Sequence, residues 1–174
     1  LYDRVEILRG ANGLLGATGD PSGTIDLVRK EARKTRFGAA SVTFGSWNKR
    51  HLMLDLNQPL TQDGSVRSRL VLSGDDSDGF RDREQDKSLG LLASVTADLS
   101  ADTRAGLGFQ LERRRINGAT WGTNVPIWFS DGSTTHFSRS MSASADWSYS
   151  LRETRTLFAN LEHRIDSNWS TRLT

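Results

Sequence analysis

The sequence contains no cysteine, so disulfide bonds and cysteine-ligated zinc sites are excluded. Its three histidines, His51, His136 and His163, are dispersed without H-x-x-x-H or H-x-H spacing, which argues against a metal site. The net charge is only +2, a balance that gives no reason to expect a nucleic-acid partner. No run of about 18 apolar residues occurs, which excludes a transmembrane helix but leaves open transmembrane β-strands, because their alternating side chains escape hydropathy windows.

Complete motifs for catalysis or nucleotide binding are also missing. Segment 10–23 is rich in glycine, but it has neither a GxGxxG form nor a G-K-[ST] ending, so a phosphate-binding loop is not indicated. Asp75, Asp76, Asp78 and Glu84 depart from the spacing of an EF-hand calcium loop, and a solvated acidic loop is the simpler interpretation. No G-x-S-x-G elbow occurs, and nothing distinguishes two carboxyl groups as a glycosidase acid and base. We therefore expect a protein that is not an enzyme and binds no metal or cofactor directly.

What the sequence does contain is a long stretch of strand periodicity that begins near residue 37. Ala105, Leu107, Phe109 and Leu111 share one face of an extended chain, and the residues between them, with Glu112, share the other. The same alternation recurs along the chain, which predicts an all-β antiparallel meander. The strands expected from it, with two more near the N-terminus, are 5–8, 24–28, 37–46, 51–60, 65–73, 88–99, 105–113, 156–165 and 169–174.

The lengths of these strands and their connections distinguish two all-β classes. Strands of about ten residues exceed the ~5–6 typical of soluble sheets and match the about 9–11 needed to cross a membrane. Polar turns such as 61–64 are short and lie at one end of the meander, whereas the connections 75–87 and 117–153 are long and lie at the other. That arrangement is typical of outer-membrane β-barrels. A soluble β-sheet carbohydrate-binding module is the alternative, and it requires a second sheet to bury the leucine-rich strand faces.

Residues 1–30 carry a more specific signal. The strand-like pieces VEILRG and GTIDLVRK enclose a glycine-rich stretch, and together they closely resemble the end of the plug domain of TonB-dependent outer-membrane siderophore receptors. Further along, segment 44–82 resembles the first barrel strands of that family, and segment 124–148 resembles the large external loop of its hydroxamate-type members. Segment 158–173 is similar to the strand, turn and strand that follow. The resemblance therefore spans essentially the whole chain.

The resemblance implies a domain organisation. Residues 1–32 correspond to the C-terminal part of a small α+β plug domain, and residues 33–174 to the first six to seven strands of the barrel. The complete fold is then a 22-stranded transmembrane β-barrel that surrounds the plug. On this interpretation the chain is an internal piece of a longer polypeptide. The glycines Gly10, Gly13 and Gly16 are expected to form a tight turn of the plug.

The resemblance also implies a function. A protein of this family imports ferric siderophores across the outer membrane of Gram-negative bacteria, and iron arrives already coordinated by the siderophore. The implied partners are the ferric siderophore, outer-membrane lipid and the TonB energy-transducing complex, whose contact site is expected outside this chain. A TonB-dependent receptor for another cargo and an outer-membrane enzyme remain alternatives, although no convergent nucleophile and base support the enzyme.

Aromatic residues of the long loop are the candidate ligand contacts. Trp121, Trp128 and Phe129 could form aromatic walls at the mouth of a barrel, or they could pack within the loop. Trp147 and Tyr149 near the end of the loop fit better in an interfacial aromatic girdle, as does Trp47.

Charged residues on the polar strand faces form the second candidate site. In a barrel those faces surround the plug, and a buried charge needs a partner, so we expect pairs across the plug–barrel interface. Such pairs would act as a lock that holds the plug in place, whereas solvated charges without that role are the alternative. The candidates are Glu6 and Arg9 from the plug, whose resemblance to family residues suggests this role, and Glu112, Arg114 and Glu162 from the barrel. Arg67, Arg69 and Arg164 lie on the same polar faces.

Overall fold

The computed structural model describes residues 1–10, 23–120 and 125–174. Within those ranges all the regular secondary structure is β-strand, and the strands form a two-stranded and a seven-stranded sheet. No helix in the described part of the chain is long and apolar enough to cross a membrane. The expected all-β antiparallel architecture is confirmed.

The small sheet pairs β1 (Tyr2–Arg9) with β2 (Gly23–Arg29), so that Ile7 lies opposite Ile25. Gly23 ends the pairing with φ +135°, and a Cβ atom there would lie 2.4 Å from the carbonyl oxygen of Leu8. A side chain at that position would therefore clash with the neighbouring strand. Of the glycines predicted to form the plug turn, Gly10 has φ +92°, and Gly13 and Gly16 lie outside the described residues.

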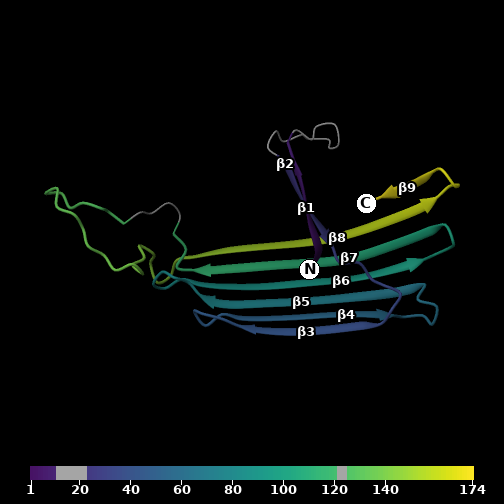
Figure 1. Ribbon diagram of the computed structural model, residues 1–174, viewed down its shortest axis with the longest axis horizontal. Helices are drawn as coiled ribbons and strands as arrows, with labels where there is room; N and C mark the ends of the chain where they lie inside the picture. The colour runs from purple at the N-terminus through teal and green to yellow at the C-terminus, as the bar shows by residue number, and fades with distance from the viewer. Residues whose placement is uncertain (11–22, 121–124) are drawn as a thin grey trace.

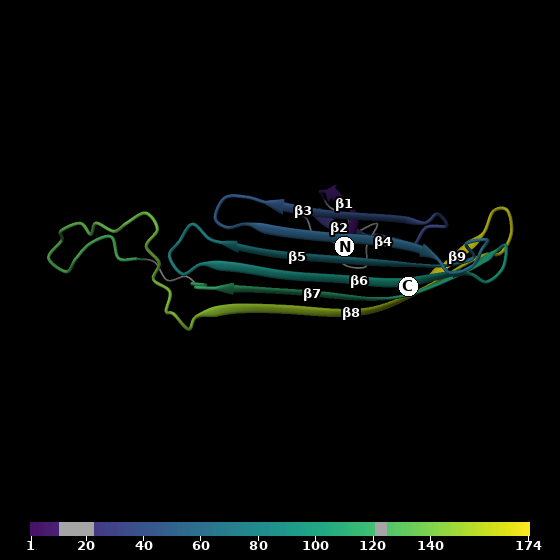
Figure 2. The ribbon, with the colours of Figure 1, turned by 90° about the horizontal axis from the view of Figure 1, so that it is seen from below.

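The large sheet is an uninterrupted meander in the order β3-β4-β5-β6-β7-β8-β9. Its strands follow the alternating segments of the sequence and pair without register shifts, because most of the apolar residues of each strand lie on one face. Figure 1 shows the small sheet crossing the strands of the large one, and Figure 2 shows the curvature of the large sheet. The strands are β3 (Phe37–Phe44), β4 (Arg50–Pro59), β5 (Val66–Asp78), β6 (Gln85–Asp98), β7 (Thr103–Asn117), β8 (Tyr149–Arg164) and β9 (Ser170–Leu173).

The connections separate into two ends of the large sheet. The turns 60–65, 99–102 and 165–169 form the short-turn end, and the chain after residue 124 projects far beyond the strands at the long-loop end before it enters β8 (Figure 1). The connection expected at 75–87 is shorter, only 79–84, because Asp75–Asp78 continue the ladder by pairing with Gln85–Ser88. The polarity of those residues therefore marks a change of surroundings along the strand, not the end of the strand.

Burial in the large sheet is the reverse of that in a soluble sheet. On β5 the buried side chains Arg67, Arg69 and Val71 alternate with the less buried Ser68, Leu70 and Leu72. The two buried arginines donate to the carbonyl oxygens of Ala32 and Glu31, in the chain that directly follows the small sheet. We call the face toward the small sheet the inner face and the opposite one the outer face. Outer-face aliphatic residues such as Leu157 are strongly exposed, at 75%. The outer face therefore requires an apolar solvent, which a lipid bilayer supplies.

Candidate functional site

The inner face of the large sheet holds a buried carboxylate, Asp55 on β4, which binds two cations. Arg69 on β5 donates from Nε to Oδ1 at 2.9 Å and from Nη2 to Oδ2 at 2.8 Å. Lys30, the first residue after β2, places its Nζ 2.7 Å from Oδ2. The side chains of Asp55 and Arg69 are each 3% exposed, so this ion-pair cluster joins the two sheets away from water. In such surroundings the removal of one partner leaves an uncompensated buried charge.

Polar side chains of the inner face also bind the main chain of residues 30–36, which we call the connector. The carboxamide of Asn57 accepts a hydrogen bond from the Arg33 amide and donates to the carbonyl oxygens of Arg33 and Thr35, all at 2.7 Å. Arg67 Nε donates to the Ala32 carbonyl oxygen at 3.2 Å. Buried backbone groups need partners, and these side chains supply them where no neighbouring strand does.

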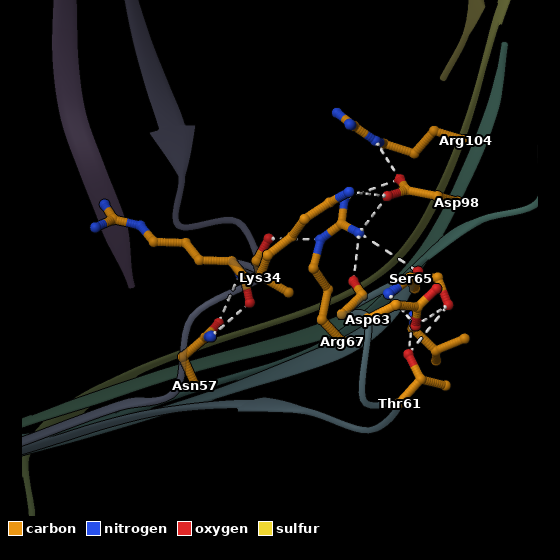
Figure 3. A network of polar contacts seen from close by, with 12 residues as sticks. Lys34, Asn57, Thr61, Asp63, Ser65, Arg67, Asp98 and Arg104 are labelled. Atoms are coloured by element: carbon orange, nitrogen blue, oxygen red, sulfur yellow. Dashed lines mark hydrogen bonds and ion pairs between the residues drawn. The ribbon is translucent and has the colours of Figure 1, made fainter. Parts of the chain in front are cut away.

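The connector is held at the short-turn end by Asp98, the last residue of β6 (Figure 3). Its carboxylate accepts hydrogen bonds from Arg67 at 2.9 and 3.1 Å and from Arg104 Nε at 2.9 Å. Lys34 of the connector lies 3.1 Å away. Asp98 therefore links β5, β7 and the connector through a single carboxylate.

The nearby turn is ordered by a second carboxylate, Asp63 (Figure 3). Ser65 donates to Asp63 Oδ1 from its amide at 3.1 Å and from its hydroxyl at 2.8 Å. Hydrogen bonding from Thr61 and Ser65 lowers the pKa of Asp63 to about 2. The turn is therefore most stable with this carboxyl group ionised.

The small sheet itself touches the inner face at a third place. The Tyr2 hydroxyl donates to Glu112 on β7, and Gln110 Nε2 donates to the Tyr2 oxygen at 2.6 Å. Arg29 Nε donates to Gln110 Oε1 at 2.6 Å, and its guanidinium lies 4.7 Å from the ring centre of Phe158. Burial, together with the hydrogen bond to Glu112, raises the pKa of Tyr2. Strands β1 and β2 thus both contact the inner face of the large sheet through polar side chains.

The structure brings only one of the five predicted lock residues, Glu112, into contact between the two sheets. Glu6 accepts a hydrogen bond from Arg4 within β1. Arg9 is exposed, and no ion pair joins it to any described residue. The other two pair within the large sheet, Arg114 with Asp86 and Glu162 with Arg172.

Sequence reasoning did not assign a role to the residues that form most of the contact between the sheets. Asp55 and Asn57 share the polar face of an otherwise leucine-rich strand, which is the signal that could have identified them. Lys30 and Tyr2 had no such signal, because their partners are distant in the chain.

The predicted ligand contacts Trp128 and Phe129 lie in a small hairpin of the long loop. Trp128 forms a bridge with Thr134, and the Phe129 amide donates to the Ser133 carbonyl oxygen at 2.8 Å. Both rings are largely exposed, at 62% and 59%. Trp121 lies outside the described residues. The long loop that carries the hairpin extends well beyond the strands (Figure 1), and both rings are open to its surroundings.

The base of the long loop is fastened to the 79–84 connection. The Asp82 amide donates to the Ser140 carbonyl oxygen at 2.6 Å, and Arg83 donates to the Ser144 carbonyl oxygen at 2.9 Å. Of the girdle candidates, Trp47 and Trp147 are exposed, and the Tyr149 ring lies against Arg115 at 4.3 Å.

The large sheet has an exposed aliphatic face and a buried charged face that binds the small sheet. These two faces define a segment of a transmembrane β-barrel wall, with the small sheet bound on the inside of the wall. No family model matches the chain. It is 36% identical over 169 residues to the ferripyoverdine receptor of Pseudomonas aeruginosa. The match covers 97% of this chain and 21% of that receptor. Identity is also 36% to the ferric-pyoverdine BN7/BN8 receptor of Pseudomonas putida, over 98% of this chain and 21% of that receptor.

Solved structures agree with these relatives. The crystal structure of the outer-membrane ferripyoverdine receptor of Pseudomonas aeruginosa bound to ferripyoverdine matches with a TM-score of 0.92 at 35% identity, over 99% of this chain and 23% of that one. The ferric-catecholate import receptor Fiu of E. coli, at 24% identity and a TM-score of 0.82, shares the fold over 98% of this chain and 27% of that one. The chain is thus a homologue of a segment of the TonB-dependent siderophore receptors, and it spans about one fifth of the length of the curated relatives.

Proposed function

We propose that the whole protein is an outer-membrane receptor that imports ferric siderophores with energy supplied through TonB, and that its cargo is a ferric pyoverdine. The observation that carries the proposal is 36% identity over 97% of the chain to a ferripyoverdine receptor. The reversed burial of the large sheet supports it, because a soluble carbohydrate-binding module would have to cover the exposed leucine faces. Iron is cargo that enters bound to the siderophore.

In this proposal the small sheet is the end of a plug domain, and the large sheet is the start of the barrel wall. Residues 1–32 then belong to the plug and residues 33–174 to the barrel. Import requires that the plug opens a path while the chain stays attached to the wall. The Tyr2–Glu112 contact and the Lys30–Asp55–Arg69 cluster are the polar contacts that would hold the plug closed.

The ligand is proposed to bind at the long-loop end, where Trp128 and Phe129 expose aromatic surface. Aromatic walls suit a rigid, partly apolar chelate because they bury a large area with few rotatable bonds. No covalent step is needed, and the protein need not replace the siderophore oxygens as iron ligands.

The experiment is uptake of radiolabelled iron by a strain that lacks the receptor gene, complemented with the full-length gene. Uptake from ferric pyoverdine that depends on both the receptor and TonB is the expected result. Purified full-length receptor that stays soluble and monomeric without detergent would contradict the membrane assignment. Complemented cells that take up no ferric siderophore would contradict the function.

A second cargo has support from a specific observation. The chain is 33% identical over 98% of its length to the metal-pseudopaline receptor CntO of Pseudomonas aeruginosa. Uptake of other metals bound to a metallophore, tested in the same strain, distinguishes this candidate from the ferric pyoverdine receptor.

A further inference from the structure

Arg83, in the 79–84 connection between β5 and β6, has a backbone conformation that favours glycine. Its φ is +67°, in the left-handed region, where a residue with a side chain is disfavoured. A non-glycine residue keeps such a conformation only where the surrounding structure determines it. Arginine at this position is therefore explained by the contacts of its side chain.

The side chain of Arg83 holds the end of the long loop that leads into β8. Its Nη1 donates to the Ser144 carbonyl oxygen at 2.9 Å, and its Nε lies 2.7 Å from Asp146 Oδ1. Ser144 is only 7% exposed, and its hydroxyl accepts a hydrogen bond from the Ser142 hydroxyl at 2.8 Å. The guanidinium thus binds a part of the loop that is buried and internally bonded.

The main chain of Arg83 lies against the other end of the loop, where the chain leaves β7. Gly118 has φ +66°, and a Cβ atom there would lie 2.5 Å from the Arg83 carbonyl oxygen. In the same connection, Arg81 Nη1 donates to Thr120 Oγ1 at 3.1 Å. The Gly118 amide also donates to the Ser148 carbonyl oxygen at 2.9 Å, which joins the two ends of the loop directly. Arg83 therefore contacts one end with its backbone and the other with its side chain.

The hairpin that carries Trp128 and Phe129 lies beyond this base. Residues 125–137 form hydrogen bonds among themselves, and within the described ranges none joins them to a strand of either sheet. Figure 1 shows this part of the chain projecting past the ends of the strands. The place at which the hairpin is held therefore depends on how the base of the loop is fixed.

We propose that Arg83 is a positioning residue for siderophore binding. By clamping both ends of the long loop, it sets where the hairpin presents Trp128, and it does so without touching the ligand. A loop that is already held in place loses less conformational freedom when the ligand binds, which strengthens binding. The proposal rests on the ligand role proposed for Trp128, but the position of the hairpin is measurable without any siderophore.

The first measurement is the distance between two spin labels in the full-length receptor without siderophore. The labelled positions are His136→Cys, beside the hairpin, and Ser46→Cys, in the connection between β3 and β4, and both are exposed. We expect a narrow distance distribution in the parent and a broad one in Arg83→Ala. Arg139→Ala is the matched control, because it removes an exposed arginine of the same loop that forms no ion pair with any described residue.

Arg83→Gly separates the side chain from the backbone. Glycine suits the left-handed conformation but cannot bind Ser144 or Asp146, so this variant should also give a broad distribution. Arg83→Lys keeps a cation without the planar fork that reaches both partners, so its distribution should be intermediate. Heat-modifiable mobility on a denaturing gel checks that each variant assembles, and Arg83→Gly replaces Arg83→Ala if the strained alanine variant does not.

The second measurement is the affinity of the same receptors for ferric pyoverdine. Arg83→Gly and Trp128→Ala should each weaken binding about tenfold. If Arg83 acts through the position of Trp128, the double variant should also bind about tenfold more weakly, whereas independent effects would multiply to about a hundredfold. Arg83→Lys should recover part of the affinity that Arg83→Gly loses.

Three results would overturn the proposal. They are a narrow distance distribution in Arg83→Gly, an affinity of Arg83→Gly equal to that of the parent, and losses that multiply in the double variant. If Trp128→Ala binds like the parent, the ligand role of Trp128 fails separately. The distance distributions and the affinity of Arg83→Gly then still decide whether Arg83 positions the loop for binding.

Discussion

Lys30 Nζ lies 2.7 Å from Oδ2 of Asp55, and this ion pair joins the first residue after the small sheet to β4 of the large sheet. Because Arg69 binds the same carboxylate, the cluster carries excess positive charge in a place with little water. Its geometry makes Asp55 the residue on which the attachment of the connector depends most strongly.

Asp55→Asn should weaken this attachment severely. The change leaves Lys30 and Arg69 without a counter-charge, for a loss of about 3–5 kcal/mol. Limited proteolysis of the full-length receptor in membranes, followed at the connector, measures the effect. Asp102→Asn removes an exposed pair with Arg164 and should change little, within ~1 kcal/mol. Equal protease sensitivity of the two variants would contradict the role of Asp55.

Asn57→Ala should release the connector backbone without adding a charge. The substitution removes three partly buried hydrogen bonds to the main chain, each worth about 0.5–1.5 kcal/mol. Hydrogen exchange at the Arg33 amide should accelerate strongly. Gln58→Ala, at the next position and facing outward, is the control. Unchanged protection of Arg33 in the Asn57 variant would show that the carboxamide is not what orders the connector.

Leu107→Arg should hinder assembly of the barrel. Leu107 is 56% exposed on the outer face, and an arginine near the bilayer midplane costs about 2–4 kcal/mol. Heat-modifiable mobility on a denaturing gel reports assembly. Ser100→Arg in a turn at the short-turn end should assemble normally. Normal assembly of both variants would remove the assignment of this face to lipid.

The 60–65 turn should loosen in strong acid. The pKa of Asp63 is lowered from 3.8 to about 2, so its ionised form is the one stabilised by folding. The stabilisation is fully present above about pH 4 and is lost as the pH falls through about 2. Hydrogen exchange at the Ser65 amide, whose donor contact is Asp63, follows the transition. Asp63→Asn should abolish the pH dependence in that window, and its persistence would assign the transition to another group.

Trp128→Ala should weaken binding of the ferric siderophore by about tenfold or more without lowering the amount of receptor. The ring is exposed and supported by the hairpin, so its removal should not disturb the fold. Titration of purified full-length receptor measures binding, and Trp147→Ala, also in the long loop and 82% exposed, is the control. If the two variants bound the ferric siderophore with equal affinity, Trp128 would have a role in the packing of the loop and none in ligand binding.

The strands were predictable where both faces follow simple rules. Leu107 and Phe109 alternate with Gly106 and Gly108, and the observed β7 includes the whole predicted segment 105–113. The end of β5 was not predictable, because the sequence of Asp75–Asp78 is typical of a polar loop although these residues continue the pairing of β5 with β6. Backbone hydrogen bonding between strands does not depend on side-chain polarity, so the strand extends beyond the apolar band.

By itself the sequence determined the class of the protein: the alternation places leucines on one face of long strands, and residues 1–30 resemble a plug. Glu112 lies on the polar face that the alternation predicts and accepts a hydrogen bond from Tyr2, whereas its role in a plug lock stays a prediction. Only the tertiary structure decided which partners meet. Asp55 with Lys30, and Asn57 with Arg33, come together through the path of the connector across the wall. No local pattern encodes such pairs, because their energy arises from burial that exists only after the two sheets have docked.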